Sequence, residues 1–168
     1  AQHSTMRYFL VAGEASGDLH ASALIRALRA EDPEASFAFM GGDKMEAAAG
    51  VAPIVHYREV AFMGIASVVK NLGKLTRIGR QIQAAMRDFA PDVVIPVDYA
   101  DFNFRFILPY AKKELRCPVI YYILPKLWAW RAGRIRQLRR YVDLGLSILP
   151  FETSYFADRG LPTLYIGN

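Results

Sequence analysis

The sequence predicts an α/β fold in which helices cover both faces of a doubly wound, mainly parallel sheet. Short apolar runs of strand type alternate with amphipathic helical segments along the whole chain, as in folds built from successive βα units. The run at 93–97 consists of Val and Ile apart from Pro96, which is typical of a central parallel strand buried on both faces. The first apolar run leads through a glycine turn into a helical segment, as in nucleotide-binding folds.

Composition and charge limit the class of protein. The 168 residues are 53% hydrophobic and 22% charged, which suits one globular domain with a substantial core. The formal net charge of +5 favours an anionic partner, whether phosphate, acidic lipid or nucleic acid. The single cysteine, Cys117, excludes an intrachain disulfide and argues against a cysteine-based zinc site. No apolar run approaches the ~20 residues of a membrane-spanning helix, and the polar residues 1–5 are expected to be a disordered start.

The strands are expected where apolar or β-branched runs lie between turn-forming residues. Pro96 cannot donate a ladder hydrogen bond, but its place near a strand end limits the cost. In chain order the expected strands cover residues 6–12, 36–40, 53–56, 93–97, 118–124, 143–149 and 162–166.

The helices are expected where apolar residues recur at helical spacing. Gly50 and Gly160 follow two of them as stop signals, Pro91 ends a third, and Pro109 predicts a kink or a late start in a fourth. The expected helices cover residues 19–29, 43–49, 59–75 with a continuation through 89, 104–115, a basic segment within 125–140, and 152–157.

The first turn, GEASGD at 13–18, joins the first strand to the first helix. Its glycines permit positive φ angles and close backbone approach, and Ser16 or Asp18 can cap a helix whose terminal amides favour an anion. The turn lacks both the GxGxxG and the GxxxxGK[ST] patterns, which argues against NAD and Walker-type ATP binding. A plain strand–helix turn is the alternative interpretation.

Two carboxylates follow the central strand, Asp98 and Asp101. In open α/β sheets the ligand crevice lies beyond the carboxyl ends of the strands, so Asp98 is a candidate general base. Either residue can also cap the next helix, expected near Phe102. The pattern leaves both interpretations, general base and helix cap, open for Asp98, and it favours the helix cap for Asp101.

An apolar stripe runs through the helical segment 59–75, flanked by Lys70 and Lys74. The spacing alone favours a core-facing helix, and the alternative is a partly exposed patch that touches lipid or acyl chains. The residues of this apolar stripe are Phe62, Met63, Ile65, Val68, Val69, Leu72 and Leu75.

A second aromatic and basic segment begins at Pro125, where Trp128 and Trp130 precede a run of arginines that starts at Arg131. Aromatic rings pack on sugar faces and guanidinium groups bind phosphate oxygens, so a sugar or lipid-phosphate site is one interpretation. RNA stacking and a solvated basic helix anchored by core tryptophans are the others.

Taken together, six motifs resemble the lipid-A-disaccharide synthase family of glycosyltransferases, which have two Rossmann-like domains (the GT-B architecture). They follow the family's order and approximate spacing. The motifs are GEASGD at 13–18, FMGI at 62–65, VDYADFN at 97–103, PKLWAWR at 125–131, LPFE at 149–152 and YIGN at 165–168.

The resemblance implies a reaction in which UDP-2,3-diacylglucosamine and 2,3-diacylglucosamine 1-phosphate form a β-1,6-linked disaccharide and UDP, without a cofactor or catalytic metal. It implies that Asp98 is the general base for the acceptor 6-hydroxyl. The implied substrate-binding residues are Gly13, Glu14, Ser16, Gly17, Asp18, Asp101, Asn103, Trp128, Trp130, Arg131 and Glu152.

The resemblance also reverses the preference for the apolar stripe, which becomes a contact with the membrane or with acyl chains. It implies a peripheral position on the cytoplasmic face of the inner membrane in Gram-negative bacteria and no nucleic-acid partner. Exposed apolar surface also promotes self-association, so a homodimer is a further expectation. Another sugar-nucleotide enzyme of the same architecture, such as an epimerase, and an RNA-binding domain are the rival interpretations.

The chain departs from the family in three ways. Ala100 stands where proline is common, Leu124 stands where a small residue usually precedes Pro125, and the family's chains are roughly twice as long. The resemblance therefore implies that residues 6–168 are the N-terminal, acceptor-side domain, and that the C-terminal nucleotide-binding domain is not part of this sequence.

Overall fold

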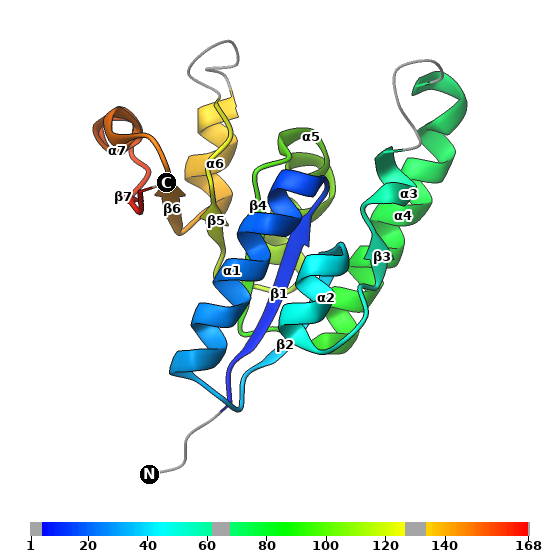
Figure 1. Cartoon of the computed structure of the whole chain (residues 1–168). Helices are drawn as coiled ribbons and strands as arrows, with labels where there is room; N and C mark the ends of the chain where they lie inside the picture. The colour runs from blue at the N-terminus through cyan, green and yellow to red at the C-terminus, as the bar shows by residue number, and fades with distance from the viewer. Residues whose placement is uncertain (1–4, 62–67, 127–133, 168) are drawn as a thin grey trace.

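The computed structural model describes residues 5–61, 68–126 and 134–167. Within them, seven strands form one sheet in the order β3-β2-β1-β4-β5-β6-β7, and every pairing is parallel (Figure 1). The predicted doubly wound, mainly parallel sheet is confirmed. The strands are β1 (Arg7–Ala12), β2 (Ser36–Gly41), β3 (Val55–His56), β4 (Val93–Val97), β5 (Ile120–Tyr122), β6 (Leu144–Ser147) and β7 (Thr163–Tyr165).

Helical segments connect these strands (Figure 1). Between these segments, residues 62–67 and 127–133 lie outside the described residues, and the side chains of 68–71 are not described. The described segments are α1 (Ala15–Glu31), α2 (Asp43–Ala49), α3 (Arg58–Ala61), α4 (Val68–Phe89), α5 (Ala100–Phe102), the π-helical η1 (Asn103–Ile107) and η2 (Tyr110–Glu114), α6 (Ile135–Tyr141) and α7 (Pro150–Ala157).

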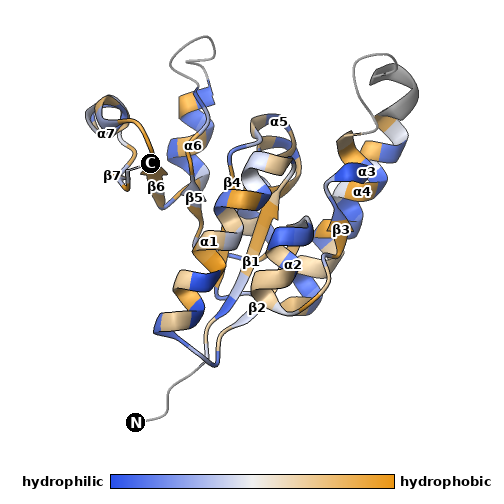
Figure 2. Ribbon diagram, viewed as in Figure 1, coloured by the Kyte–Doolittle hydropathy of each residue, from blue (hydrophilic) through white to orange (hydrophobic). Residues whose placement is uncertain are grey.

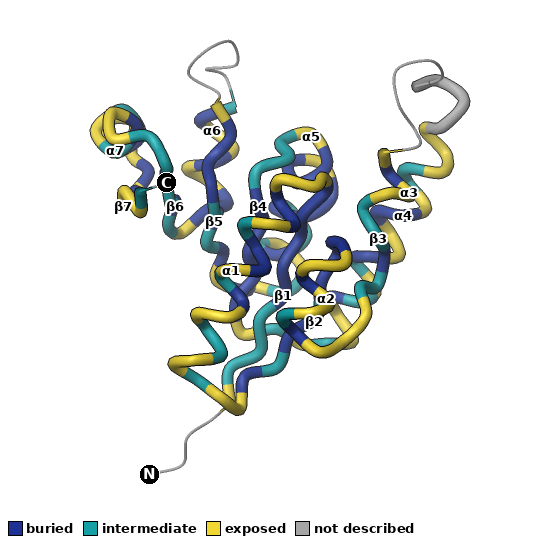
Figure 3. Tube along the Cα trace, in the orientation of Figure 1, coloured by how far each residue is buried: buried dark blue, intermediate teal, exposed yellow. Residues whose placement is uncertain are grey.

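The core has two parts, one on each face of the sheet. Side chains alternate between the faces of a strand, so on β1 Phe9 packs with Ile82 of α4 while Leu10 packs with Ile25 of α1. All four side chains are fully buried. Figure 3 shows the resulting buried centre along β1 and β4, and Figure 2 shows that the upper half of β1 is hydrophobic. This two-sided burial explains the near-continuous apolar run of β4.

Strand β5 pairs with β4 at few positions. Five residue pairs join β1 to β4, whereas β5 pairs with β4 through Val97 and Tyr122, supplemented by an isolated bridge between Val94 and Val119. The strand order also reverses direction between β1 and β4, the point at which ligands bind in doubly wound sheets. The place where a ligand is expected therefore lies beside the carboxyl end of β4.

Helix α1 begins four residues earlier than predicted, at Ala15. Most of the expected turn at 13–18 is the first turn of this helix, and the cap expected from Ser16 or Asp18 is wrong, because the N-cap residue is Glu14 and it makes no side-chain capping bond. Gly17 explains the early start: a Cβ there would lie 3.2 Å from the Cβ of Ala12. Close packing on β1 thus outweighs the low helix propensity of glycine.

The predicted helix 104–115 also begins early, at Ala100, and has π-helical turns on both sides of Pro109. Proline has no N–H to donate to the carbonyl four residues before it, and wider turns accommodate that missing bond. By contrast, α2 matches the predicted bounds, and Gly50 ends it in the left-handed conformation with φ +77°.

Candidate functional site

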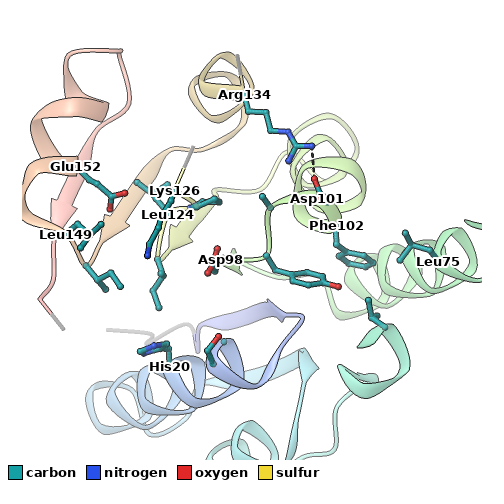
Figure 4. Close-up of a pocket in the computed structure, with 18 residues that line it drawn as sticks. His20, Leu75, Asp98, Asp101, Phe102, Leu124, Lys126, Arg134, Leu149 and Glu152 are labelled. Atoms are coloured by element: carbon teal, nitrogen blue, oxygen red, sulfur yellow. Dashed lines mark ion pairs between the residues drawn. The ribbon is translucent and has the colours of Figure 1, made fainter. Parts of the chain in front are cut away.

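A cavity of about 690 Å³ lies at the carboxyl ends of the central strands. Its walls come from α1, from residues 98–102 after β4, from 123–126 after β5, and from 148, 149 and 152 after β6; Val60, Leu75 and Arg134 complete the lining (Figure 4). This is the edge of the sheet where a ligand crevice is expected, and the size is typical of a small-molecule site.

Asp98 enters this cavity from a sharp corner after β4. Asp98 and Tyr99 both adopt the left-handed conformation, with φ +44° and +50°. Two donors fix the corner by binding the Asp98 carbonyl: Asn103 Nδ2 at 2.8 Å and Tyr121 Oη at 2.5 Å. Left-handed backbone costs roughly 1–2 kcal/mol per residue outside glycine, and such strain is concentrated at functional sites.

The surroundings of Asp98 raise the pKa of its carboxyl. Burial is the main cause, and the nearby Glu14 charge adds to it. A hydrogen bond with the Tyr99 backbone and the positive charges of Lys126 and His20 act in the opposite direction. A carboxylate with a raised pKa binds a proton more strongly, which suits a general base.

The glycine motif lies directly against this corner. Ser16 and Gly17 line the cavity, whereas Glu14 is exposed outside it and acts on Asp98 through its charge. A Cβ on Gly13 would lie 2.3 Å from the Tyr99 ring. Glycine at 13 therefore allows the ring that follows Asp98 to pack on the first turn.

Asp18 points away from the cavity, although it belongs to the same motif. Its side chain is buried, and its carboxylate accepts hydrogen bonds from three backbone amides at the start of α2: Gly42 at 2.9 Å, Lys44 at 3.1 Å and Met45 at 3.1 Å. A carboxylate at a helix N-terminus satisfies amides that have no partner within the helix. Asp18 therefore joins α1 to α2, and a contact between Asp18 and substrate stays a prediction.

Asp101 and Glu152 line the cavity on the side away from α1. The prediction that Asp101 caps the following helix is wrong, because the N-cap residue of α5 is Tyr99. Asp101 instead forms an ion pair with Arg134 at 2.7 Å. Glu152 is buried in the first turn of α7 and accepts a hydrogen bond from Ser147 Oγ at 2.5 Å. Asn103 is buried too, but it acts on the backbone of Asp98 rather than on the cavity wall.

Sequence reasoning missed two basic residues of the cavity, His20 and Lys126. Helical periodicity contained the signal for His20, because it lies one turn after Ser16 and Gly17 on the same side of α1. Lys126 follows the apolar run of β5, at the strand end where ligands bind. Both residues face the opening near Asp98 (Figure 4).

The structure describes only part of the apolar stripe. Leu75 lines the cavity and Leu72 is 43% exposed; Phe62, Met63 and Ile65 lie outside the described residues, as do the side chains of Val68 and Val69. Trp128, Trp130 and Arg131 also lie outside the described residues. Further along α4, Ile78, Ile82 and Met86 are buried. Across the described residues, the helices are too short or too polar to span a bilayer.

Solved structures of similar shape include proteins bound to UDP or to a UDP-sugar. Staphylococcus aureus MnaA in complex with UDP has a TM-score of 0.68 at 14% identity, covering 98% of this chain and 44% of that one. The UDP-N-acetylglucosamine 2-epimerase of Neisseria meningitidis, bound to its UDP-sugar, has a TM-score of 0.66 at 12% identity, covering 97% and 46%. At these identities the likeness establishes the fold: this chain matches about half of a GT-B-like protein.

The family to which this chain belongs follows from its sequence relatives. The lipid-A-disaccharide synthase of Myxococcus xanthus is 44% identical over 96% of this chain and 42% of its own length, and that of Geobacter sulfurreducens is 36% identical over 99% and 43%. The chain thus spans less than half the length of these curated relatives. The family model for lipid-A-disaccharide synthetase matches residues 8–168. The match runs through nearly the whole chain, and the protein therefore belongs to the lipid-A-disaccharide synthase family.

Proposed function

We propose that this chain is the acceptor-side domain of a glycosyltransferase that makes lipid A disaccharide 1-phosphate. In this reaction 2,3-diacylglucosamine passes from UDP-2,3-diacylglucosamine to 2,3-diacylglucosamine 1-phosphate, and UDP is released. One observation carries the proposal beyond family membership: Asp98 has a raised pKa and opens from a strained corner into the cavity at the carboxyl end of β4.

Asp98 acts in this proposal as the general base. The acceptor 6-hydroxyl oxygen attacks C1 of the donor sugar and gives its proton to the Asp98 carboxylate. The bond between C1 and the diphosphate oxygen breaks, and UDP leaves with that electron pair. Burial keeps the carboxylate poorly solvated, which strengthens its hold on the transferred proton.

The other predicted site residues keep proposed roles that follow their positions. Ser16, Gly17, Asp101 and Glu152 lie where they can contact the acceptor. Gly13, Glu14, Asp18 and Asn103 surround that wall without lining it, so their influence would pass through the residues they support. The proposed substrate contacts of Trp128, Trp130 and Arg131 remain predictions, as does the expectation that no metal or cofactor takes part.

The proposed division of labour follows the length of the relatives. This chain covers 42% of the Myxococcus xanthus enzyme, so a second domain would supply most of the UDP site. We expect residues 6–168 alone to bind acceptor micelles weakly and to turn over little. The proposed place of work is the cytoplasmic face of the inner membrane, reached through the apolar stripe, with a homodimer as the proposed assembly and no nucleic-acid partner.

The test is UDP release from both substrates in detergent micelles, with the full-length protein that contains this chain. Asp98→Asn should lower kcat by about 10²–10⁴-fold, the usual contribution of a general base. Asp88→Asn is the matched control, because Asp88 is an exposed residue of α4 outside the cavity. An Asp98→Asn enzyme that keeps more than about a tenth of the wild-type kcat would refute the assigned role of Asp98.

A further inference from the structure

We propose that the side of the cavity formed by Val60, Leu75 and Phe102 holds one acyl chain of the acceptor and limits the chain length that the enzyme accepts. The inference rests on the glycosyl transfer proposed above, because that acceptor carries acyl groups on the same sugar that presents its hydroxyl to Asp98. A site for such a molecule needs apolar surface close to the base.

The cavity has this two-sided character. In Figure 4, Leu75 and Phe102 lie on one side of Asp98, and His20, Lys126 and Glu152 lie on the other. The ion pair of Asp101 and Arg134 lies above Phe102 in the same view. A ligand that reaches Asp98 therefore meets ionisable groups in one direction and, below this ion pair, hydrocarbon in the other. The polar side suits the sugar and its phosphate, and the apolar side suits an acyl chain.

The apolar wall is firmly built. Val60 and Phe102 are 7% and 3% exposed and belong to the main core cluster, against which Leu75 and Tyr99 also pack. The ring of Phe102 lies 5.1 Å from that of Phe106 and 6.2 Å from that of Tyr99, centre to centre. Close-packed side chains resist displacement, so this wall sets a limit to the length of a chain that lies against it.

The apolar surface also continues out of the cavity along α4. Leu72 lies one turn before Leu75 and is 43% exposed, and residues three apart in a helix share a side. Hydrocarbon contact can therefore extend from the outside of α4 to the cavity wall. An acyl chain following this path avoids the charged side of the cavity.

The test compares two acceptors, one with butanoyl and one with tetradecanoyl chains, at the same mole fraction in one detergent, with the full-length protein. Leu75→Trp fills part of the apolar side and should lower kcat/KM for the long-chain acceptor about tenfold, the effect of losing one or two buried methylenes. The short-chain acceptor should change less than about twofold. Val60→Ala widens the same side and should shift the preference toward the longer chain.

The control is Leu164→Trp, because Leu164 is an exposed residue of β7 that does not line the cavity. It should leave the ratio of the two kcat/KM values unchanged. Equal losses on both acceptors in Leu75→Trp, or an unchanged ratio in both cavity variants, would overturn the acyl-chain site while leaving the transfer reaction intact. A wild-type enzyme that releases no UDP with either acceptor would instead overturn the proposed function.

Discussion

Two aspartates near the carboxyl ends of neighbouring strands differ in their surroundings: Asp18 in the first turns of α1 and Asp98 in the corner after β4. Asp18 is buried, and three backbone amides of α2 satisfy its carboxylate. Asp98 is partly exposed and faces the cavity, and its surroundings raise its pKa. Satisfied hydrogen bonds stabilise the fold, whereas a carboxylate that the fold leaves poorly solvated is available for chemistry. The comparison teaches that motif membership alone does not separate a carboxylate that is satisfied within the fold from one that faces the cavity.

The largest effect on stability is expected at Asp18. Asp18→Ala removes the acceptor of three amide hydrogen bonds, and unpaired buried donors cost about 1–3 kcal/mol each unless water reaches them. We expect a net loss of about 3 kcal/mol, which lowers Tm by roughly 6–12 °C in a chain of this size. Thermal unfolding followed by circular dichroism measures it.

Asp43→Ala is the control for Asp18, since it removes an acidic side chain from the same helix start. Asp43 is 72% exposed and pairs with His56 and Arg58, so its loss should cost no more than about 1 kcal/mol. Equal destabilisation by the two variants would contradict the structural role assigned to Asp18.

A smaller effect is expected where the turn after β1 touches the corner after β4. Gly13→Ala places a methyl group 2.3 Å from the Tyr99 ring, so the ring must move, at a cost of about 2 kcal/mol. The displaced ring adjoins Asp98, and kcat of the full-length enzyme should fall as well. Both quantities are measurable on one preparation, by thermal unfolding and by UDP release.

Gly73→Ala is the matched glycine substitution, because a Cβ there meets nothing within 4 Å and the residue lies inside α4. Alanine favours a helix over glycine by about 0.8–1 kcal/mol, so this variant should be more stable than the wild type. Gly13→Ala with unchanged stability and unchanged kcat would show that Tyr99 is not held by the first turn.

The surroundings of Asp18 and Asp98 show how much of the fold and of the candidate site can be predicted from the sequence. The bounds of β4 and the place of Asp98 follow from a local pattern, a buried run that ends in a carboxylate, and both were predicted. The partners of Asp18 lie at least 24 residues away in α2, and only the sheet order brings them together. His20 and Lys126 were missed for the same reason: their convergence on Asp98 is set by tertiary packing, which short sequence windows do not contain.

The smallest expected effect is a pH dependence of stability that comes from Asp98. Because the pKa of Asp98 is raised above 3.8 in the folded protein, its contribution to stability is present below the unfolded pKa and is lost as pH rises through the folded value. Asp98→Asn removes this titration, and asparagine tolerates the left-handed conformation. The Tm of the variant relative to wild type should therefore increase between about pH 4 and pH 7, although its kcat falls. A Tm difference that decreases over this range would show that the fold stabilises the ionised carboxylate, as in an ordinary ion pair, and would remove the electrostatic argument for Asp98 as the base.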